Sequence, residues 1–421
     1  MFPQTFTVTS ERILNVLLHK AASKGHVDVA RQLIRRGAEV NFRGPGGLSP
    51  LHDAAYNGHG RMTLLLLERG ANPDAGDSEG WTPLHWAAEL GRVDIAKLLL
   101  DKRANVNSRN RLGQTPLHRA VFNSRTRVAS LLIDMGADVD ARDGVEHLHY
   151  EDELENQEEA QDPPDKKNHE RTPLHYAAEL GRVDIAKLLI GKGADINARN
   201  VDGHTPLHYA AELGRTDIAR LLLNKGADIS ARCSEGLTPL HKAVCKGQGL
   251  VIKLLLEQGA SIDEKDRDGW SAMHWAAELG RTDMTKLLIS KRADINLKNC
   301  LGQTPLHRAA SSGRPRVAAL LLANGAKIDA KDSDGMVPLH WATESGRIEM
   351  VKLLLSEGAD PDLKDSEGLT PLHKAALEGR MRITKILLSK GANPRLKDKN
   401  GITPMDLAEG MGHKAVAKLL K

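Results

Sequence analysis

Eleven histidines recur along the chain, and histidine is a common metal ligand and a common general acid or base near neutral pH. They are His19, His52, His85, His118, His175, His208, His241, His274, His307, His340 and His373. Most successive members are 33 residues apart. Elements that pack side by side at such intervals lie about 10 Å apart. Two imidazoles that share one ion through bonds of about 2 Å must lie much closer, so we predict no metal site from these histidines.

Motifs that carry catalysis or hold a cofactor are absent from the sequence. It contains no GxSxG, no HExxH, no GxxxxGK[ST] and no complete GxGxxG after a strand. Acidic residues are numerous but evenly spread, and no pattern brings two of them into one cleft. We therefore expect no enzymatic activity, no catalytic residues and no cofactor.

A second recurring position, directly after each histidine, is mostly aromatic or basic. It reads Lys20, Asp53, Trp86, Arg119, Tyr176, Tyr209, Lys242, Trp275, Arg308, Trp341 and Lys374, and Leu407 takes it in the last unit. We call these residues the aromatic-basic row. The aromatic members have a glutamate three residues later, namely Glu89, Glu179, Glu212, Glu278 and Glu344. Trp81 and Trp270 precede Trp86 and Trp275 by five residues.

Two interpretations of the row stay open. Tryptophan and arginine dominate the binding energy of many protein interfaces, so the row could bind a segment of another protein. The residues predicted to do so are Trp81, Trp86, Glu89, Arg119, Tyr176, Tyr209, Lys242, Trp270, Trp275, Arg308, Trp341 and Lys374. A narrower variant uses Trp81, Trp86 and Glu89 as a cage for a methylated lysine. In the other interpretation, the rings only pack against the next unit.

The stretch Gly80 to Leu100 shows which elements carry these residues. Thr82 is a good N-cap, Pro83 suits the first helical position, and Gly91 ends that helix after about two turns. A second helix over residues 92–102 places apolar residues at helical spacing. On the first helix, Leu84, Ala87 and Ala88 form one apolar face, with Trp86 and Glu89 opposite. Neither helix can bury its apolar face alone, so the unit requires neighbours.

Copies of this stretch fill most of the chain. Relatives of TPLH begin at Ser49, Thr82, Thr115, Thr172, Thr205, Thr238, Ser271, Thr304, Val337, Thr370 and Thr403, and a degenerate copy, LLHKAA, precedes them. The period of 33 residues, the TPLHxAA segment, the LLL run and GADIN at Gly193 to Asn197 resemble the ankyrin repeat. The resemblance implies an all-α solenoid of about twelve helix-turn-helix repeats over residues 16–421, after an extension at 1–15.

The resemblance carries further expectations. Segments such as 193–203 would form β-hairpin fingers, with turns at Gly80, Gly113, Gly203, Gly236, Gly269, Gly302, Gly335, Gly368 and Gly401. The histidines would tie neighbouring repeats together through hydrogen bonds, and the aromatic-basic row and the fingers would line a concave groove that binds other proteins. Finger asparagines Asn41, Asn107, Asn197 and Asn296 match a position that is hydroxylated in some ankyrin repeats, which would add the mass of one oxygen atom to those peptides.

A recurring arginine is a further charged feature with an open interpretation. In eight repeats an arginine follows the end of the first helix, and these are Arg92, Arg125, Arg182, Arg215, Arg281, Arg314, Arg347 and Arg380. They could attract an acidic protein, RNA or anionic lipid, or form a solvated edge that nearby Asp and Glu residues neutralise. The overall charge of +4 and the absence of a lysine-rich tail argue against nucleic acid as the partner.

Other expectations come from composition. Cys233, Cys245 and Cys300 are odd in number and lack CxxC spacing, which favours reduced thiols and an intracellular location, in the cytoplasm or nucleus. We find neither a secretory signal nor a transmembrane run. The expected protein is therefore a monomeric, non-catalytic scaffold or adaptor for other proteins, and the alternative is a reader of charged targets.

An insertion of 24 residues, 144–167, is the one break in the period. It contains nine acidic residues against Lys166 and Lys167, a net charge of −7, so the rest of the chain carries +4 − (−7) = +11. Low hydrophobicity and high charge predict a disordered loop on a finger. It is either a tolerated surface insertion or an acidic flap that competes with ligands for the basic repeats.

Deletion of residues 144–167 separates these two interpretations. A competing flap predicts tighter binding of an acidic partner to the deletion variant, measured by calorimetric titration. Unchanged affinity would show that the insertion is only tolerated.

Overall fold

The computed structural model describes residues 4–144 and 170–421, and this part of the chain is built from α-helices and one short 3-10 helix, with no strand. The prediction of an all-α fold is therefore confirmed. The chain divides into two compact units. The first comprises Met1–Ala210 and Asp217–Ala227, and the second comprises Ala211–Thr216 and Asp228–Lys421.

The helices follow one another in pairs. The first twelve are α1 (Gln4–Lys24), α2 (Val27–Arg35), α3 (Pro50–Asn57), α4 (Gly60–Glu68), α5 (Pro83–Leu90), α6 (Val93–Asp101), α7 (Pro116–Phe122), α8 (Thr126–Asp134), α9 (Pro173–Leu180), α10 (Val183–Gly191), α11 (Pro206–Glu212) and α12 (Thr216–Asn224), with η1 at Pro45–Gly47. The others are α13 (Pro239–Lys246), α14 (Gly249–Glu257), α15 (Ala272–Leu279), α16 (Thr282–Ser290), α17 (Pro305–Ser312), α18 (Pro315–Ala323), α19 (Pro338–Glu344), α20 (Ile348–Ser356), α21 (Pro371–Leu377), α22 (Met381–Ser389), α23 (Pro404–Gly410) and α24 (Lys414–Leu420).

The pair α5–α6 shows why the sequence forms these helices. Thr82 has extended backbone dihedrals and caps α5, and Pro83 occupies the first helical position. Gly91 ends the helix with φ of 73°, a left-handed conformation that glycine adopts without steric cost. Arg92 then caps α6. The predicted helix boundaries are thus confirmed to within a residue or two.

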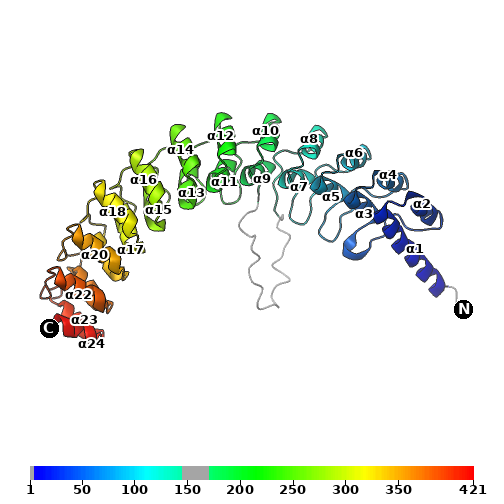
Figure 1. Cartoon of the computed structure of the whole chain (residues 1–421). Helices are drawn as coiled ribbons and strands as arrows, with labels where there is room; N and C mark the ends of the chain where they lie inside the picture. The colour runs from blue at the N-terminus through cyan, green and yellow to red at the C-terminus, as the bar shows by residue number, and fades with distance from the viewer. Residues whose placement is uncertain (1–3, 145–169) are drawn as a thin grey trace. The chain divides into compact units, whose positions relative to one another are not determined.

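Each pair buries its apolar faces against its neighbours. Within the first unit, α3, α5, α7 and α9 pack in one row, and α4, α6, α8 and α10 pack in a second row (Figure 1). Within the second unit, α13 to α23 and α14 to α24 form the same two rows. Leu84, Ala87 and Ala88 are fully buried between first helices, as predicted, and Ile95 and Leu99 are buried on α6. Small residues let these helices approach closely.

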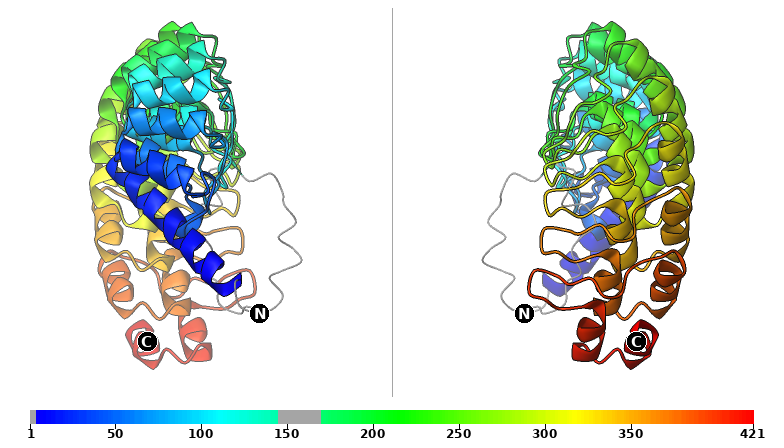
Figure 2. Two further views of the ribbon diagram at one scale, coloured as in Figure 1. Left: turned by 90° about the vertical axis from the view of Figure 1, so that its right-hand side faces the viewer. Right: turned by 90° about the vertical axis from the view of Figure 1, so that its left-hand side faces the viewer.

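The segments that join one pair to the next, which we call the fingers, project to one side of the helices (Figure 2). In the finger 72–81, the amide of Asp77 donates to the carbonyl of Trp81 over 2.8 Å and the amide of Gly80 donates back to Asp77 over 3.0 Å. The amide of Ser78 donates to Gly46 of the preceding finger over 2.8 Å. Each finger is therefore a hydrogen-bonded hairpin turn tied to its neighbour, although no strand forms within the described residues.

Glycine is required at the finger turns. All nine predicted turn glycines have φ between 69° and 81°. A Cβ atom at Gly113 would overlap the carbonyl oxygen of Gly144 in the next finger. The backbones of neighbouring fingers thus approach too closely for any side chain at this position.

The two irregular regions of the sequence are placed as follows. Helix α1 spans Gln4–Lys24, so the predicted boundary between residues 15 and 16 falls inside one continuous helix. The acidic insertion lies outside the described residues, apart from Gly144. The finger that carries it is closed as the others are, because the amide of Asp143 donates to the carbonyl of Arg171 over 3.0 Å.

Arg103 and Arg292 occupy positions where most repeats have glycine, directly after the second helix of a pair. Their φ angles are 64° and 65°, in the left-handed region. A side chain with a Cβ atom costs about 1 kcal/mol there relative to glycine. Both repeats therefore lose stability at this residue.

Replacing Arg103 or Arg292 with glycine should raise the free energy of unfolding by about 1 kcal/mol, because the strain of the left-handed conformation is removed. Urea titration followed by circular dichroism measures the change. The matched control is Arg103→Ala, which keeps a Cβ atom and should give no comparable gain. A loss of stability in both glycine variants would contradict the assignment of strain.

Candidate binding face

The recurring histidines connect each first helix to the following finger. His85 shows the arrangement: the amide of Thr82 donates to Nδ1 over 3.2 Å, and Nε2 lies 2.9 Å from the carbonyl oxygen of Gln114. Because Nδ1 accepts a hydrogen bond, the proton is on Nε2, which donates to that carbonyl. Nε2 makes the equivalent contact, at 2.9–3.2 Å, in His52, His118, His175, His241, His274, His307, His340 and His373.

Burial keeps these imidazoles neutral. It lowers the pKa of His85, His118, His274 and His340 to about 4 and that of His175 to about 3, and the hydrogen bonds to carbonyl oxygens offset this only in part. Both ring nitrogens of such a histidine are used within the chain. These side chains therefore hold the fingers in place.

The aromatic-basic row is anchored to the fingers in the same way. The indole N–H groups of Trp86, Trp275 and Trp341 donate to the carboxylates of Asp77, Asp266 and Asp332, over 3.3, 2.9 and 2.8 Å. In each case the aspartate lies nine residues before the tryptophan. We call this position the finger base. The other carboxylate oxygen of the aspartate accepts hydrogen bonds from backbone amides of the same finger. In Asp77 these come from the amides of Glu79 and Trp81.

The predicted site residues are less exposed than a simple binding surface requires. Tyr176 and Tyr209 are buried, with 7% and 8% of their surface exposed. The remaining predicted residues, both tryptophans of each pair included, are half-buried. Packing within the chain therefore accounts for part of the row, as one of the two interpretations proposed, while one face of most side chains still reaches solvent.

The first cluster on this face contains Trp81, Trp86, Glu89 and Arg119. The two indole rings contact each other with centroids 4.6 Å apart and planes tilted by 33°. The guanidinium of Arg119, from the next repeat, lies 4.8 Å above the Trp81 ring and forms an ion pair with Glu89 over 2.8 Å. The arginine thus receives both a cation–π contact and a carboxylate.

The second unit repeats this cluster with different residues. The rings of Trp270 and Trp275 contact each other with centroids 4.9 Å apart and planes tilted by 44°, and Arg308 lies 4.6 Å above Trp270. Nε of Arg308 donates to Glu278 over 3.0 Å. The structure therefore brings together predicted residues from adjacent repeats in the same way in both units.

A third cluster uses tyrosines. The guanidinium of Arg171 lies 4.1 Å from the ring of Tyr176 and 4.7 Å from that of Tyr209, and it forms an ion pair with Glu179. The Tyr176 hydroxyl donates to Asp143, which is the finger base of that repeat although the insertion places it 33 residues before the tyrosine. Burial and the nearby Asp143 carboxylate raise the pKa of Tyr176 well above its usual range. Arg171 was not predicted as a site residue, and its place directly before TPLH was the available signal.

Two lysines complete the row. Lys242 lies 3.8 Å from the carboxylate of Glu212, which Lys246 also approaches to 3.4 Å. Lys374 instead pairs with Asp365, its own finger base, over 3.6 Å. The two lysines are thus neutralised by acids at different positions.

The residues of the predicted methyl-lysine cage contact one another and Arg119 in this structure. The rings of Trp81 and Trp86 have centroids 4.6 Å apart and planes tilted by 33°, and the Arg119 guanidinium lies 4.8 Å from the Trp81 ring. The cage residues are therefore already used to hold a side chain of the chain itself.

The arginines after the first helices also make contacts within their units. Arg125, Arg281, Arg314, Arg347 and Arg380 each donate to a carbonyl at the end of the preceding first helix, over 2.9–3.1 Å. Cations stabilise the negative end of a helix dipole. This edge therefore joins repeats, although Arg125, Arg281, Arg314 and Arg347 remain exposed.

The predicted hydroxylation sites lie on the fingers. Asn41 donates to the carbonyl of Gly70 over 3.0 Å and accepts the amide of Asn72 over 2.8 Å. Asn296 makes the equivalent bonds to Gly325 and Lys327, and the side chains of Asn107 and Asn197 also donate to the next repeat. These amides are partly solvent-accessible, but a hydroxylase would have to displace the hydrogen bonds.

Sequence reasoning missed a ladder of basic residues directly before the finger bases. In the second unit Lys265, Lys298, Lys331 and Lys364 each donate to the carbonyl of the residue 33 positions later, over 2.7–3.1 Å. Arg43 and Arg109 do the same in the first unit. The 33-residue recurrence of one basic position was the available signal.

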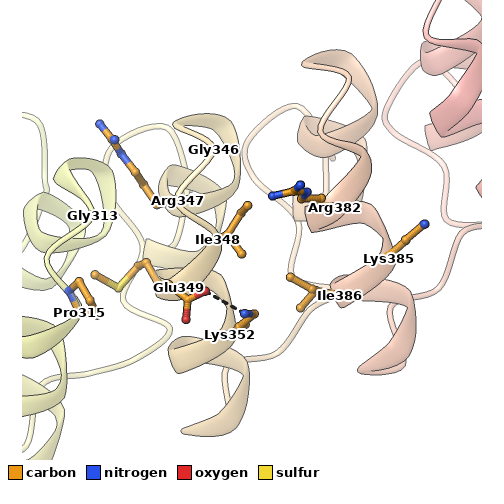
Figure 3. Close-up of a pocket in the computed structure, with 11 residues that line it drawn as sticks. Gly313, Pro315, Gly346, Arg347, Ile348, Glu349, Lys352, Arg382, Lys385 and Ile386 are labelled. Carbon is orange, nitrogen blue, oxygen red and sulfur yellow. Dashed lines mark hydrogen bonds and ion pairs between the residues drawn. The ribbon is translucent and has the colours of Figure 1, made fainter.

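The second unit also has an open cavity of about 660 Å³ (Figure 3). Helices α18, α20 and α22 line it, with Ile348 and Ile386 near Arg382 and Lys385 (Figure 3). Glu349 and Lys352 form an ion pair over 2.8 Å at its edge. The cavity contains none of the predicted site residues.

Comparison with known proteins gives one finding. A family model described as ankyrin repeats (3 copies) matches residues 15–77, 70–143, 144–233, 230–299, 252–332, 293–365 and 339–421. No curated protein matches the chain. Among the residues that the structure describes, no helix is long and apolar enough to cross a membrane, and no group of three or more potential ligands could hold a metal ion.

The buried histidines predict a loss of stability in mild acid. Their pKa values are lower in the folded chain than the value of about 6.5 in the unfolded chain, so the unfolded state binds more protons between these values. Stability is then full above about pH 6.5 and falls as the pH drops towards 4, by on the order of 1 kcal/mol per pH unit for each histidine. Urea midpoints at pH 7.5 and pH 5 measure this.

The variant His340→Gln is the matched control for this prediction. It removes one titrating group, so the dependence of unfolding free energy on pH should become shallower by about one proton. An identical slope for the variant, or a midpoint that does not change with pH, would contradict the role given to burial.

Proposed function

The chain belongs to the ankyrin-repeat family, whose repeats generally mediate protein–protein interactions, and from that premise we propose that it is a scaffold or adaptor protein. In this proposal, segments of partner proteins bind the face formed by the aromatic-basic row and the fingers. We further propose that the chain is non-catalytic, as this family typically is. The observation that carries the proposal is the fixed, half-buried state of Trp86, Trp275 and Trp341.

Anchored tryptophans suit this role. Each indole N–H is already bonded to a finger base, so its ring is oriented before a partner arrives. A side chain that is already fixed loses little conformational entropy on binding, and that loss is a large part of the cost of association. Because each ring is half-buried, one part of it packs against the chain and the other part can contact a partner.

The free cysteines support an intracellular setting. Cys233, Cys245 and Cys300 are unpaired, and Cys300 is exposed. An exposed thiol persists in the reducing cytoplasm or nucleus more readily than in an oxidising compartment. We therefore propose one of these two compartments for the protein.

Affinity capture from cell lysate with quantitative mass spectrometry tests the proposed face. The test variant carries Trp86→Ala, Trp275→Ala and Trp341→Ala. Partners that bind this face should fall by more than about tenfold, because truncating one hot-spot residue costs about 2 kcal/mol or more. Circular dichroism and thermal unfolding confirm that the variant folds.

A matched variant removes exposed apolar side chains from the second helices instead. Val29, Leu250 and Met381 lie on α2, α14 and α22 with 49%, 70% and 41% of their surface exposed. Replacing all three with alanine should leave the captured proteins unchanged. If this control loses the same proteins, or if the tryptophan variant keeps them, partners bind elsewhere.

A further inference from the structure

The five glutamates that follow the aromatic members of the row differ in one respect. Four of them form an ion pair with a cation of the chain: Glu89 with Arg119, Glu179 with Arg171, Glu212 with Lys242, and Glu278 with Arg308. The fifth, Glu344, has no ion pair within residues 4–144 and 170–421. It is half-buried and lies one turn after Trp341 on α19.

The finger base of the next repeat explains why Glu344 has no ion pair while the other four glutamates do. Where the cation of the row is Arg119, Lys242 or Arg308, the finger base nine residues earlier is neutral. Those finger bases are Asn110, Cys233 and Asn299. Each of these cations therefore pairs with the glutamate of the preceding repeat.

The next repeat after Glu344 has a different combination. Its cation is Lys374, and its finger base is Asp365, whose side chain is only 4% exposed. The two groups pair over 3.6 Å, with the lysine side chain 13% exposed. Lys374 is thus held by its own finger and does not reach Glu344.

Trp341 is also without the neighbours that complete the other clusters. The residue five positions earlier, tryptophan in the two stacked pairs, is Met336, which is buried. In the described part of the chain, the Trp341 ring has no stacked aromatic ring and no cation above it. Its orientation is nevertheless fixed, because its N–H donates to Asp332 over 2.8 Å.

We propose that Trp341 and Glu344 bind the arginine side chain of a partner protein. In the tyrosine cluster Arg171 lies on the ring of Tyr176 and pairs with Glu179, three residues later. Trp341 and Glu344 keep this combination of ring and carboxylate without the arginine. A planar guanidinium suits the site because it can lie on an indole face and donate to a carboxylate at the same time. This inference rests on the proposed function only in taking the arginine to belong to a protein.

A substitution outside the pair Trp341 and Glu344 should also abolish the site. Asp365→Asn should release Lys374, which then pairs with Glu344 as Lys242 pairs with Glu212. The change is conservative, because Asn110 and Asn299 accept the same finger amides in other repeats as Asp365 does. The released lysine would fill the site and block an external arginine.

Fluorine NMR of the full chain labelled with 5-fluorotryptophan tests the proposal. The five tryptophans give one resonance each, and Trp341→Phe identifies the one that belongs to Trp341. The probe is N-acetylarginine amide, with the citrulline amide as its neutral isostere. The arginine probe should shift the Trp341 resonance in a saturable way, and the citrulline probe should not.

Two variants of the chain and three comparisons between probes can overturn the proposal. Glu344→Gln and Asp365→Asn should each lower the affinity for the arginine probe by about threefold or more. This is the range expected for a partly exposed ion pair. No saturable shift, equal shifts by the citrulline probe, or no effect of either variant would overturn the proposal. Tighter binding of a trimethyllysine amide than of the arginine amide would also overturn it and would assign the site to methylated lysine.

The two proposals fail in distinguishable ways. The titration uses a small molecule, so it can succeed even if no protein is captured through the tryptophans. In the reverse case, loss of captured proteins with the tryptophan variant and a failed titration would leave the scaffold function standing without an arginine site at Trp341.

Discussion

The hydrogen bond from a buried histidine to the following finger is the interaction on which the rest of this structure depends. A helix pair of this length cannot bury its apolar face alone and is stable only next to another pair. The imidazole adds a polar link across that boundary, for example from His85 to Gln114. Because the linked carbonyl belongs to the residue directly before the next TPLH segment, each helix pair positions the finger that precedes the next pair.

Fixed fingers give the aromatic-basic row its second anchor. The finger base lies nine residues before the row and accepts a donor from it wherever the row is tryptophan. Where the residue of the row is Arg119, Lys242 or Arg308, the finger base is neutral. The cation then forms an ion pair with the glutamate of the preceding repeat. One variable position therefore decides whether a cation stays within its repeat or crosses to the neighbour. Lys374 with Asp365 is the case in which it stays.

Much of this fold could be predicted from local sequence signals. The Thr82 cap, the Gly91 stop and the finger glycines act within a few residues, so their conformations follow from backbone sterics. The outcome at the candidate site depends on contacts between residues about 30 positions apart, such as Glu89 with Arg119. Helical periodicity placed Trp86 away from the core but could not show that the Trp81 ring contacts it or that Arg119 lies over Trp81. The nine-residue spacing between finger base and row was visible in the sequence, but only the structure showed that it joins two side chains.

If the finger base directs the cation of its repeat, a crystal structure of the Asp365→Asn variant should show a displaced lysine. We expect Nζ of Lys374 to move away from residue 365 to within ion-pair distance of Glu344. The finger amides that bond to Asp365 should then bond to the amide oxygen of the substituted side chain, as the equivalent amides bond to Asn110. A Lys374 side chain that keeps its position beside residue 365 while Glu344 remains unpaired would contradict the account.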